Sequence, residues 1–403
     1  MDFSHSPRAL ELIDSVGAFL RDRVSPAEAA ARERLMTSTD WSVPPELAVL
    51  KEEARAAGLW NLFLPSVSGL SNVDYAPLAE LMGRTHWGAE VMNCAAPDTG
   101  NMEVLHAFGT PEQKERWLTP LLEGTIKSAF CMTEPDVASS DATNMECTAV
   151  VEGDEVVVNG VKWWSTGVGH PDCELLVVMA LTDADAPRHS QHSIVLVPRS
   201  TPGVTVERML QTMGWYDAPG GHGQVRFDDV RVPLSNVVGQ PGGAFAIAQG
   251  RLGPGRIHHC MRAIGLAEKA LELACERAVS RTAFGKPIAN LGGNRERIAD
   301  ARMAIQQARL LVLHAAWLLD IEGLLGALSA ISQIKVVVPN MAQSVVDLAI
   351  QLHGGAGLSQ DFPLGPAWLV ARALRIADGP DEVHRGVVAK IELAPYIQRA
   401  AGT

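Results

Sequence analysis

The sequence predicts an α+β chain in which a small β domain lies between two helical domains. Apolar residues recur at helical spacing in the first and last parts of the chain, and the period changes to two in the middle. No regular alternation of strands and helices, as in a doubly wound parallel sheet, is visible. We therefore expect an N-terminal helical domain over 1–125, a small antiparallel β domain over 126–240 and a C-terminal four-helix bundle over 241–403.

The composition is that of an ordinary globular protein. The chain has 403 residues, of which 47% are apolar and 20% charged, and its formal net charge is −12. This acidic balance argues against nucleic acid or an anionic membrane as the main partner. The uncharged stretch between Arg309 and Asp320 is about half a bilayer span, so we expect no membrane span. Six scattered cysteines and an acidic first segment indicate reduced thiols, no signal peptide and a cytoplasmic protein.

The N-terminal part contains two clear helix starts. Ser6 before Pro7 is typical of an N-cap followed by the first helical residue. Thr110 and Pro111, with Gln113 following, form a capping box that starts another short helix.

The middle part is rich in β-branched residues. Its segment CTAVVEGDEVVVNGVKWWSTG is divided by Gly153–Asp154 and Asn159–Gly160, two dipeptides that predict hairpin turns. Trp163–Trp164 lies in a predicted strand and would send one ring to each face. One ring would then lie in the core, and the other either in the core or against an aromatic ligand.

The C-terminal part shows three long apolar stripes at helical spacing, which predict long helices joined by short links. Pro339 lies inside the third stripe and should kink that helix. The stripes cover Ile257–Ala274, Ile298–Leu319 and Ile331–Leu348.

Three motifs have more than one interpretation from their residues alone. His258–His259 could bind a metal, but no acidic or cysteine partner has ligand spacing, so structural histidines and no metal site are the preferred interpretation. The glycines of His353–Gly357 either end a helix or let the backbone approach a ligand. The Thr133–Asn144 loop offers hydroxyls and backbone donors for a heterocycle and phosphates, or is simply a capped loop.

Five ordered motifs resemble the acyl-CoA dehydrogenase family over nearly the whole chain. FCMTEPDVASSD is similar to the family's flavin loop, NGVKWWSTG to its second flavin segment, and RTAFGKPI, QLHGGAG and RIADGPDEVHR to its C-terminal signatures. GRLGPGRIHHCMR resembles the subgroup whose animal members are fused to a phosphotransferase-like domain, which we expect to be missing here. The resemblance implies an acyl-CoA dehydrogenase-like fold with FAD as cofactor.

The resemblance also assigns roles to single residues. Trp164 would pack on the flavin ring, Thr166 would lie near flavin N5, and the Arg281 guanidinium suits a diphosphate. The flavin loop is one residue longer than the commonest form, so either Ser139 or Ser140 could contact the pyrophosphate, the other facing CoA. The implied FAD-binding residues are Phe130, Met132, Thr133, Ser139, Trp164, Thr166, Arg281, Phe284, Gln351, Gly354, Gly355, Pro380 and Glu382, and the implied substrate-binding residues are Ser140, Arg256 and Gly379.

Asp378 is the predicted general base. The family usually carries a glutamate in a Tyr-Glu-Gly triplet, where this chain has Ala377, Asp378 and Gly379. Other members place the base on the first long C-terminal helix, but the matching residue here is Gly255, which cannot serve. The alternative interpretation of Asp378 is a helix N-cap, and that of Arg256, implied to lie near the catalytic carboxylate, is a surface charge.

The implied function is FAD-dependent oxidation of an acyl-CoA to a trans-2-enoyl-CoA in fatty acid beta-oxidation. Asp378 would take the α-proton, electrons would pass to an electron-transfer flavoprotein, and the chain would form a homodimer or homotetramer. An alternative is a flavin oxidase that uses O2, because nitroalkane-oxidising relatives also use an aspartate base. A third, a flavin-binding member that binds nucleic acid without dehydrogenating, is disfavoured by the acidic charge and by Asp378.

Overall fold

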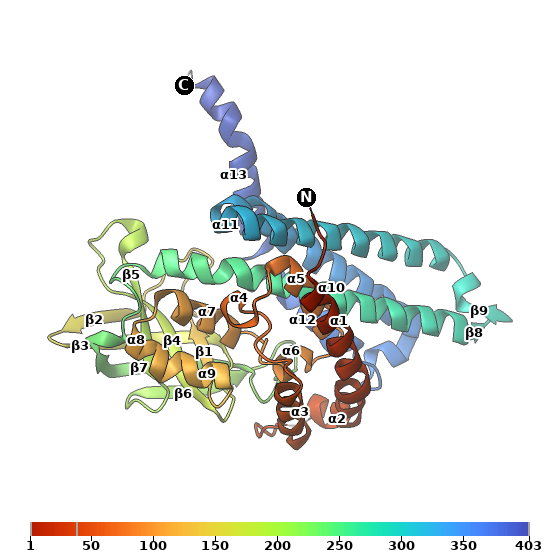
Figure 1. The fold of residues 1–403 in the computed structure, drawn as a ribbon, viewed down its shortest axis with the longest axis horizontal. Coiled ribbons are helices and arrows are strands. Elements are labelled where there is room, and N and C mark those ends of the chain that lie inside the picture. The colour runs from red at the N-terminus through yellow and green to blue at the C-terminus, as the bar shows by residue number, and fades with distance from the viewer. Residues whose placement is uncertain (1, 38, 402–403) are drawn as a thin grey trace. The chain divides into compact units, whose positions relative to one another are not determined.

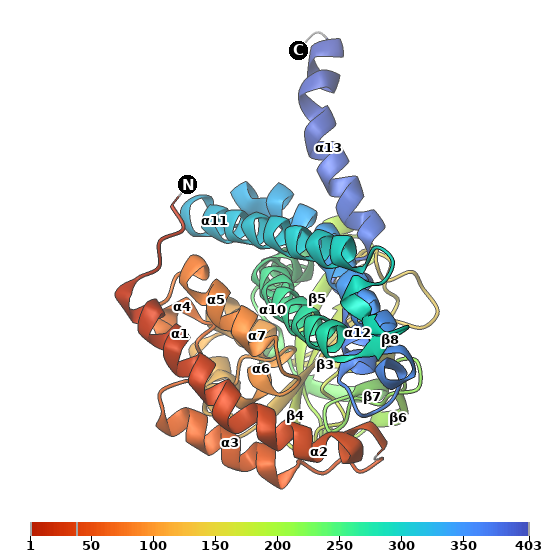
Figure 2. The same ribbon diagram turned by 90° about the vertical axis from the view of Figure 1, so that its right-hand side faces the viewer.

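The computed structural model describes residues 2–37 and 39–401, which form two compact units. The helical unit comprises the residues up to 36, residues 54–91 and the chain from 256 onwards. The sheet unit comprises residues 37–53 and 92–255. Helices from both ends of the chain therefore share one unit (Figures 1 and 2).

The N-terminal helices are short and begin at polar caps. The Ser6 side chain accepts a hydrogen bond from the Ala9 N–H, which confirms the predicted N-cap. Before the sheet, Thr110 and Gln113 form the predicted capping box. The elements are α1 (Pro7–Phe19), η1 (Leu20–Val24), α2 (Ser25–Thr37), α3 (Pro45–Ala56), α4 (Pro65–Ser68), α5 (Asn72–Met82), α6 (Gly88–Val91), α7 (Asp98–Phe108), α8 (Pro111–Gln113), η2 (Lys114–Leu118) and α9 (Thr119–Glu123).

The sheet unit is built on a seven-stranded mixed sheet with the order β1-β4-β2-β3-β7-β6, to which β5 adds by pairing with β4. Parallel pairing of β4 with β1 and β2 shows that the prediction of a purely antiparallel domain was wrong. A turn dipeptide indicates that two strands adjacent in the sequence pair antiparallel. Parallel strands are joined by a long connection, so no such local pattern predicts their pairing. The strands are β1 (Lys127–Cys131), β2 (Thr148–Glu152), β3 (Glu155–Thr166), β4 (Cys173–Leu181), β5 (His192–Pro198), β6 (Val204–Leu210) and β7 (His222–Pro233).

Only the first of the two predicted hairpin turns exists. Gly153–Asp154 joins β2 to β3, but Asn159–Gly160 lies inside β3, where the register with β7 shifts. A Cβ at Gly160 would lie 2.8 Å from the Cys147 Cα, so this glycine allows a close backbone approach at a bulge. The Asn159 side chain accepts a hydrogen bond from the Asp229 N–H instead of forming a turn.

The C-terminal part is helical, as predicted. The three predicted apolar stripes are largely buried, in α10 (Ala244–Ser280) and α11 (Asn294–His353). The chain breaks its helical path at Gly323, with φ 69°, so α11 consists of two helices, whereas Pro339 lies within helix. The remaining elements are β8 (Thr282–Ala283), β9 (Lys286–Pro287), η5 (Ile288–Asn290), η6 (Gly354–Leu358), α12 (Leu364–Ala373) and α13 (Asp381–Ala400), with η3 (Arg188–Ser190) and η4 (Leu234–Asn236) in the sheet unit.

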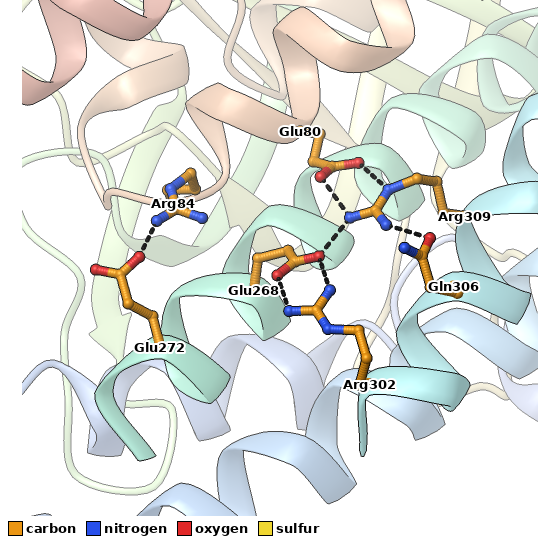
Figure 3. A network of polar contacts seen from close by, with 7 residues as sticks. All are labelled: Glu80, Arg84, Glu268, Glu272, Arg302, Gln306 and Arg309. Atoms are coloured by element: carbon orange, nitrogen blue, oxygen red, sulfur yellow. Dashed lines mark hydrogen bonds and ion pairs between the residues drawn. The ribbon is translucent and has the colours of Figure 1, made fainter. Parts of the chain in front are cut away.

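An ion-pair network joins three helices of the helical unit that are far apart in sequence. Arg309 on α11 contacts Glu80 on α5 at 2.7 Å and Glu268 on α10 at 2.5 Å (Figure 3). Arg302 makes a bidentate pair with the same Glu268, at 2.6 and 2.8 Å. Because Arg309 and Glu268 each contact two oppositely charged partners, the network aligns α5, α10 and α11 better than isolated surface pairs would.

One helical segment, Asn294–Leu358, contains an apolar window long enough to cross a membrane by length and composition. Core helices of soluble proteins pass the same test. The absence of a membrane span therefore stays a prediction.

Candidate active site

A buried ion pair braces the predicted flavin loop, which follows β1. The Lys162 Nζ lies 2.6 Å from the Glu134 Oε1, and both side chains are almost fully buried. Lys162 also donates to the Met132 carbonyl at 2.9 Å. The Glu134 carboxylate accepts the backbone N–H groups of Glu146 and Cys147, at 2.8 and 2.9 Å, so it ties the two ends of the loop together. A buried charge is stable only when it is paired and hydrogen-bonded, as here.

Sequence reasoning missed Glu134 and Lys162. The available signal was a lysine within an apolar strand, close in the sequence to a loop that carries a glutamate. Such a lysine is seldom fully buried unless it has a partner.

The two loop serines differ in exposure. The Ser139 hydroxyl is half-buried, accepts the Glu134 N–H at 2.9 Å and donates to the Val137 carbonyl at 3.3 Å. Ser140 is exposed. Ser139 therefore shapes the loop itself, and its contact with a cofactor remains a prediction, as does that of Ser140. The preceding predicted residues Phe130, Met132 and Thr133 are all half-buried.

Trp164 is exposed where β3 departs from regular pairing. It has φ 52°, and the register between β3 and β7 shifts from Lys162 to Ser165. Trp164 as a whole is 39% exposed, and Trp163 is half-buried rather than fully in the core, because the bulge interrupts the alternation of faces. The Trp163 Nε1 is buried without a hydrogen-bond partner among the described residues. An exposed aromatic face beside a buried unused donor fits a planar heterocyclic ligand.

His222 is a third residue that the sequence did not single out. Its Nδ1 lies 2.9 Å from the Thr166 hydroxyl, and its ring lies 5.4 Å from the Trp164 ring. Burial lowers the pKa of His222, with Asp217 acting in the opposite direction, so the neutral imidazole is favoured. The hydroxyl predicted to lie near flavin N5 therefore has a defined partner on β7.

In the helical unit, Asp378 lies in a strained turn whose carbonyl groups are bound by buried basic side chains. Asp378 has φ 55°, and its carbonyl accepts hydrogen bonds from the Arg256 Nε at 2.9 Å and the His384 Nε2 at 3.2 Å. The Lys335 Nζ donates to the carbonyls of Leu374 and Ala377 at 2.5 and 2.8 Å. These bonds hold the turn in a conformation that a non-glycine residue seldom adopts.

The structure excludes the alternative interpretations of Asp378 and Arg256, whose roles in the site stay predictions. The N-cap of α13 is Pro380, and no side chain caps that helix, so Asp378 is not an N-cap residue. Arg256 is 8% exposed, so it is not a surface charge. Gly379 has φ 100°, and a Cβ there would lie 2.9 Å from the His384 Nε2, which explains the glycine after Asp378.

Burial also defines the charge states around this turn. It lowers the pKa of His384 to about 4, helped by the nearby Arg256 and Lys335 charges, so this ring is neutral near pH 7. Its Nε2 must then carry the proton that it donates to the Asp378 carbonyl. Burial likewise lowers the pKa of Lys335. For Asp381 burial acts in the opposite direction, but hydrogen bonds from Asn340 and Arg375 outweigh it and lower the pKa.

The other predicted cofactor residues of the helical unit are exposed, apart from the half-buried Pro380. Arg281 and Phe284 lie in the exposed β8–β9 hairpin, where Phe284 is 93% exposed. Gly354 ends α11 with φ 62° as its C-cap, and a Cβ on Gly354 or Gly355 would meet nothing within 4 Å, so both glycines border open space. Gln351 lines a groove of about 540 Å³ along α11, together with Arg297, Asp300, Ala301, Ala304, Asn340, Met341, Ser344, Val345, Asp347 and Leu348. Pro380 is half-buried, and Glu382 is exposed beside Arg385 at 3.6 Å.

Sequence comparison defines the class to which this fold and these residues belong. The chain matches the acyl-CoA dehydrogenase N-terminal domain over residues 6–125, the middle domain over 129–230 and the C-terminal domain over 242–393. The chain therefore belongs to the acyl-CoA dehydrogenase family.

Individual relatives place the chain within the family. It is 49% identical to a mycobacterial protein, "Probable acyl-CoA dehydrogenase FadE2" of Mycobacterium tuberculosis, over 98% of this chain and 97% of that one. It is 53% identical to mouse acyl-CoA dehydrogenase family member 10, over 96% of this chain but only 37% of that protein. The animal proteins that it matches are acyl-CoA dehydrogenase family members 10 and 11, and this chain spans 37% to 52% of their length. The similarity to the animal subgroup is confirmed.

A solved structure shares the fold closely. It is described as "Structure of a putative acyl-CoA dehydrogenase from Mycobacterium abscessus" and is 67% identical, with a TM-score of 0.95 over 98% of this chain and 100% of that one. The predicted acyl-CoA dehydrogenase-like fold, with a middle β domain between helical domains, is therefore confirmed.

Proposed function

We propose that this chain is an FAD-dependent acyl-CoA dehydrogenase that converts an acyl-CoA to the trans-2-enoyl-CoA, with Asp378 as the general base. The observation that carries the proposal is the carboxylate at 378, in a turn whose carbonyls bind Arg256, Lys335 and His384. Three buried or half-buried basic groups leave this segment little freedom, as the placement of a base requires.

The chain's own part in the reaction is proton removal and orientation. The α-proton of a thioester is weakly acidic, so a carboxylate needs a fixed position and a stabilised enolate-like transition state to remove it. Asp378 takes this proton, and its backbone N–H is the donor that we propose for the thioester carbonyl. Arg256 acts through the Asp378 carbonyl as a positioning residue. When bound, FAD supplies the hydride acceptor for the β-carbon.

Each of the two units carries residues that suit part of a flavin dinucleotide. In the sheet unit, Trp164 presents an exposed ring beside the Thr166–His222 pair, and the Glu134–Lys162 pair fixes the loop that carries Met132 and Thr133. In the helical unit, Arg281 and Phe284 are exposed, and Gly354 and Gly355 border open space. An aromatic face, backbone donors and a guanidinium are what an isoalloxazine and a diphosphate require.

The remaining parts of the proposal rest on family membership. They are transfer of electrons to an electron-transfer flavoprotein, a role in fatty acid beta-oxidation, and assembly into a homodimer or homotetramer. A cytoplasmic location is proposed from the six scattered cysteines.

Anaerobic titration of the purified protein with short, medium, long and branched acyl-CoAs tests the reaction. The oxidised-flavin absorption band should bleach with at least one acyl-CoA and yield the enoyl-CoA. Bound flavin that no acyl-CoA bleaches would contradict the proposal. The absence of flavin after incubation with FAD would contradict the assignment of all the cofactor residues.

The second candidate is a flavin oxidase, favoured by one observation: the base position holds an aspartate, one methylene shorter than the usual glutamate. Primary nitroalkanes are the corresponding test substrates. Stoichiometric H2O2 formation with nitroalkanes and O2, without bleaching by acyl-CoAs, would replace the dehydrogenase assignment.

A further inference from the structure

We infer that Arg262 and His259 form a positioning pair for Asp378, in which Arg262 selects the His259 tautomer and His259 presents an N–H to the carboxylate. The three residues lie within the helical unit, two of them one turn apart on α10. The catalytic consequence rests on the proposed function, whereas the tautomer does not.

The geometry connects the three side chains through the two ring nitrogens of one histidine. The Arg262 Nη2 lies 3.2 Å from the His259 Nδ1, and the His259 Nε2 lies 3.6 Å from the Asp378 Oδ2. The His259 and Asp378 side chains are 25% and 23% exposed, so water only partly screens their contact. The distance of 3.6 Å makes this an electrostatic contact rather than a direct hydrogen bond.

The chemistry of the donor decides the tautomer. A guanidinium has only N–H donors, so the His259 Nδ1 must accept and carries no proton. In the neutral ring the proton is then on Nε2, the nitrogen that faces the carboxylate. A second proton on Nδ1 would place two N–H groups and two positive charges against each other, which disfavours the imidazolium.

Several other titratable groups lie around Asp378, and those that bind the turn bind its backbone carbonyls. On α10 they are Arg256 and Arg262, with the Cys260 thiol; on α11 the group is Lys335, and on α13 they are His384 and Asp381. Arg256 and His384 bind the Asp378 carbonyl, and Lys335 binds that of Ala377. His259 lies at the carboxylate, so it can orient the atoms that take the proton.

The predicted consequence is twofold. A neutral ring whose N–H faces the carboxylate stabilises the anionic form of Asp378 electrostatically, without cancelling its charge. Loss of that donor should slow α-proton removal and raise the pH at which the carboxylate becomes active. Gln in place of His259 can supply an N–H at a similar position, whereas Phe cannot.

Nitrogen-15 NMR of the holoprotein labelled at its histidine rings tests the tautomer directly. The ring signals that disappear in His259→Gln should show a bare Nδ1 and a protonated Nε2 at neutral pH. In Arg262→Met the same ring should populate both tautomers and bind a second proton at a higher pH. A wild-type ring protonated at Nδ1, or an unchanged ring in Arg262→Met, would overturn the inference.

The rate of flavin bleaching tests the catalytic consequence, with an acyl-CoA that bleaches the wild type. His259→Phe should lower the rate about tenfold and move the acid limb of its pH profile upward, and His259→Gln should recover most of the loss. His106→Phe, on the exposed face of α7, is the matched control and should change nothing. If His259→Phe and His259→Gln lose the same fraction of the bleaching rate and the acid limb does not shift, His259 has only a structural role and the inference is overturned. If no acyl-CoA bleaches the wild type, the proposed function fails, while the NMR result still decides the tautomer.

Discussion

The Arg256 Nε donates to the Asp378 carbonyl at 2.9 Å, although 122 positions separate the two residues in the sequence. Arg256 is buried, and it adjoins the glycine at which other family members carry their base. Arg256 is the first residue of α10 that belongs to the helical unit. This bond therefore joins α10 to the turn that bears the proposed base.

Replacing Arg256 should lower both the stability of the protein and the rate of flavin bleaching, and the two effects can be measured separately. In Arg256→Met the Asp378 carbonyl loses a partner, which costs about 1–3 kcal/mol of unfolding free energy. Flavin bleaching by an acyl-CoA should slow by about ten- to a hundredfold because the turn is held less tightly. Urea unfolding and anaerobic stopped-flow spectra measure the two effects. Arg8→Met, at an exposed site on α1, is the control, and a wild-type bleaching rate in Arg256→Met would remove Arg256 from the positioning role.

The Lys162–Glu134 pair should be essential for the flavin loop. Lys162→Met leaves the Glu134 carboxylate buried without its cation, which we expect to cost about 3–5 kcal/mol of unfolding free energy. FAD content should fall at the same time, since the loop is held by this carboxylate. The double variant Lys162→Met with Glu134→Gln should recover part of the stability, because no charge is then left buried. Denaturant unfolding and flavin absorbance measure both, and a single variant as stable as the double one would contradict the account.

His258 should make stability depend on pH. It is 1% exposed, its ring lies 5.0 Å from the Tyr75 ring, and neither ring nitrogen has a hydrogen-bond partner among the described residues. Burial lowers the pKa of His258 to about 3, helped by the Arg262 charge. Below the unfolded pKa of about 6.5 the unfolded chain binds a proton that the folded chain does not, so stability is present above that pH and lost as pH falls.

The size of this effect can be measured by substitution. His258 should contribute about 1.4 kcal/mol of lost unfolding free energy per pH unit on the acid side of that midpoint. His258→Phe keeps an aromatic ring beside Tyr75 and Phe63 and removes this slope. His384 contributes in the same direction in both proteins, so the difference isolates His258. Parallel stability curves for the two proteins would contradict the assignment.

Arg281 tests the cofactor assignment in the helical unit. Arg281→Ala should weaken FAD binding by about ten- to a hundredfold, the loss of one charge-assisted contact to a phosphate. The unfolding midpoint of the apoprotein should stay unchanged, since the residue is exposed. Equilibrium dialysis with FAD measures the affinity, and unaltered affinity would exclude Arg281 from the phosphate site.

The helices and their caps could be predicted because their causes are local. Ser6 and the Thr110–Gln113 box act within one turn, and the buried stripes of α10 and α11 follow from apolar spacing alone. The parallel pairs of β4 could not be predicted, because they join segments that no local signal connects. Gly160 and Gly323 could not be interpreted from the sequence for a similar reason. A glycine indicates that the backbone can adopt a positive φ, but the residues that surround it in the fold determine whether a turn, a bulge or a helix break forms.

The residues of the site divide in a similar way. Asp378 could be chosen from a motif, whereas His259, His222 and Lys162 act through partners brought close by folding. The buried pair of Lys162 with Glu134 is the clearest case, since neither residue alone distinguishes a structural brace from a surface charge.

The most direct test of the central claim is the anaerobic flavin spectrum of Asp378→Asn during titration with an acyl-CoA that bleaches the wild type. Asparagine keeps the size of the side chain and removes the base, so the variant should retain yellow, bound FAD and show no bleaching on the timescale of the wild type. We expect the bleaching rate to fall by at least about a thousandfold. A variant that bleaches at nearly the wild-type rate would place the base at another residue.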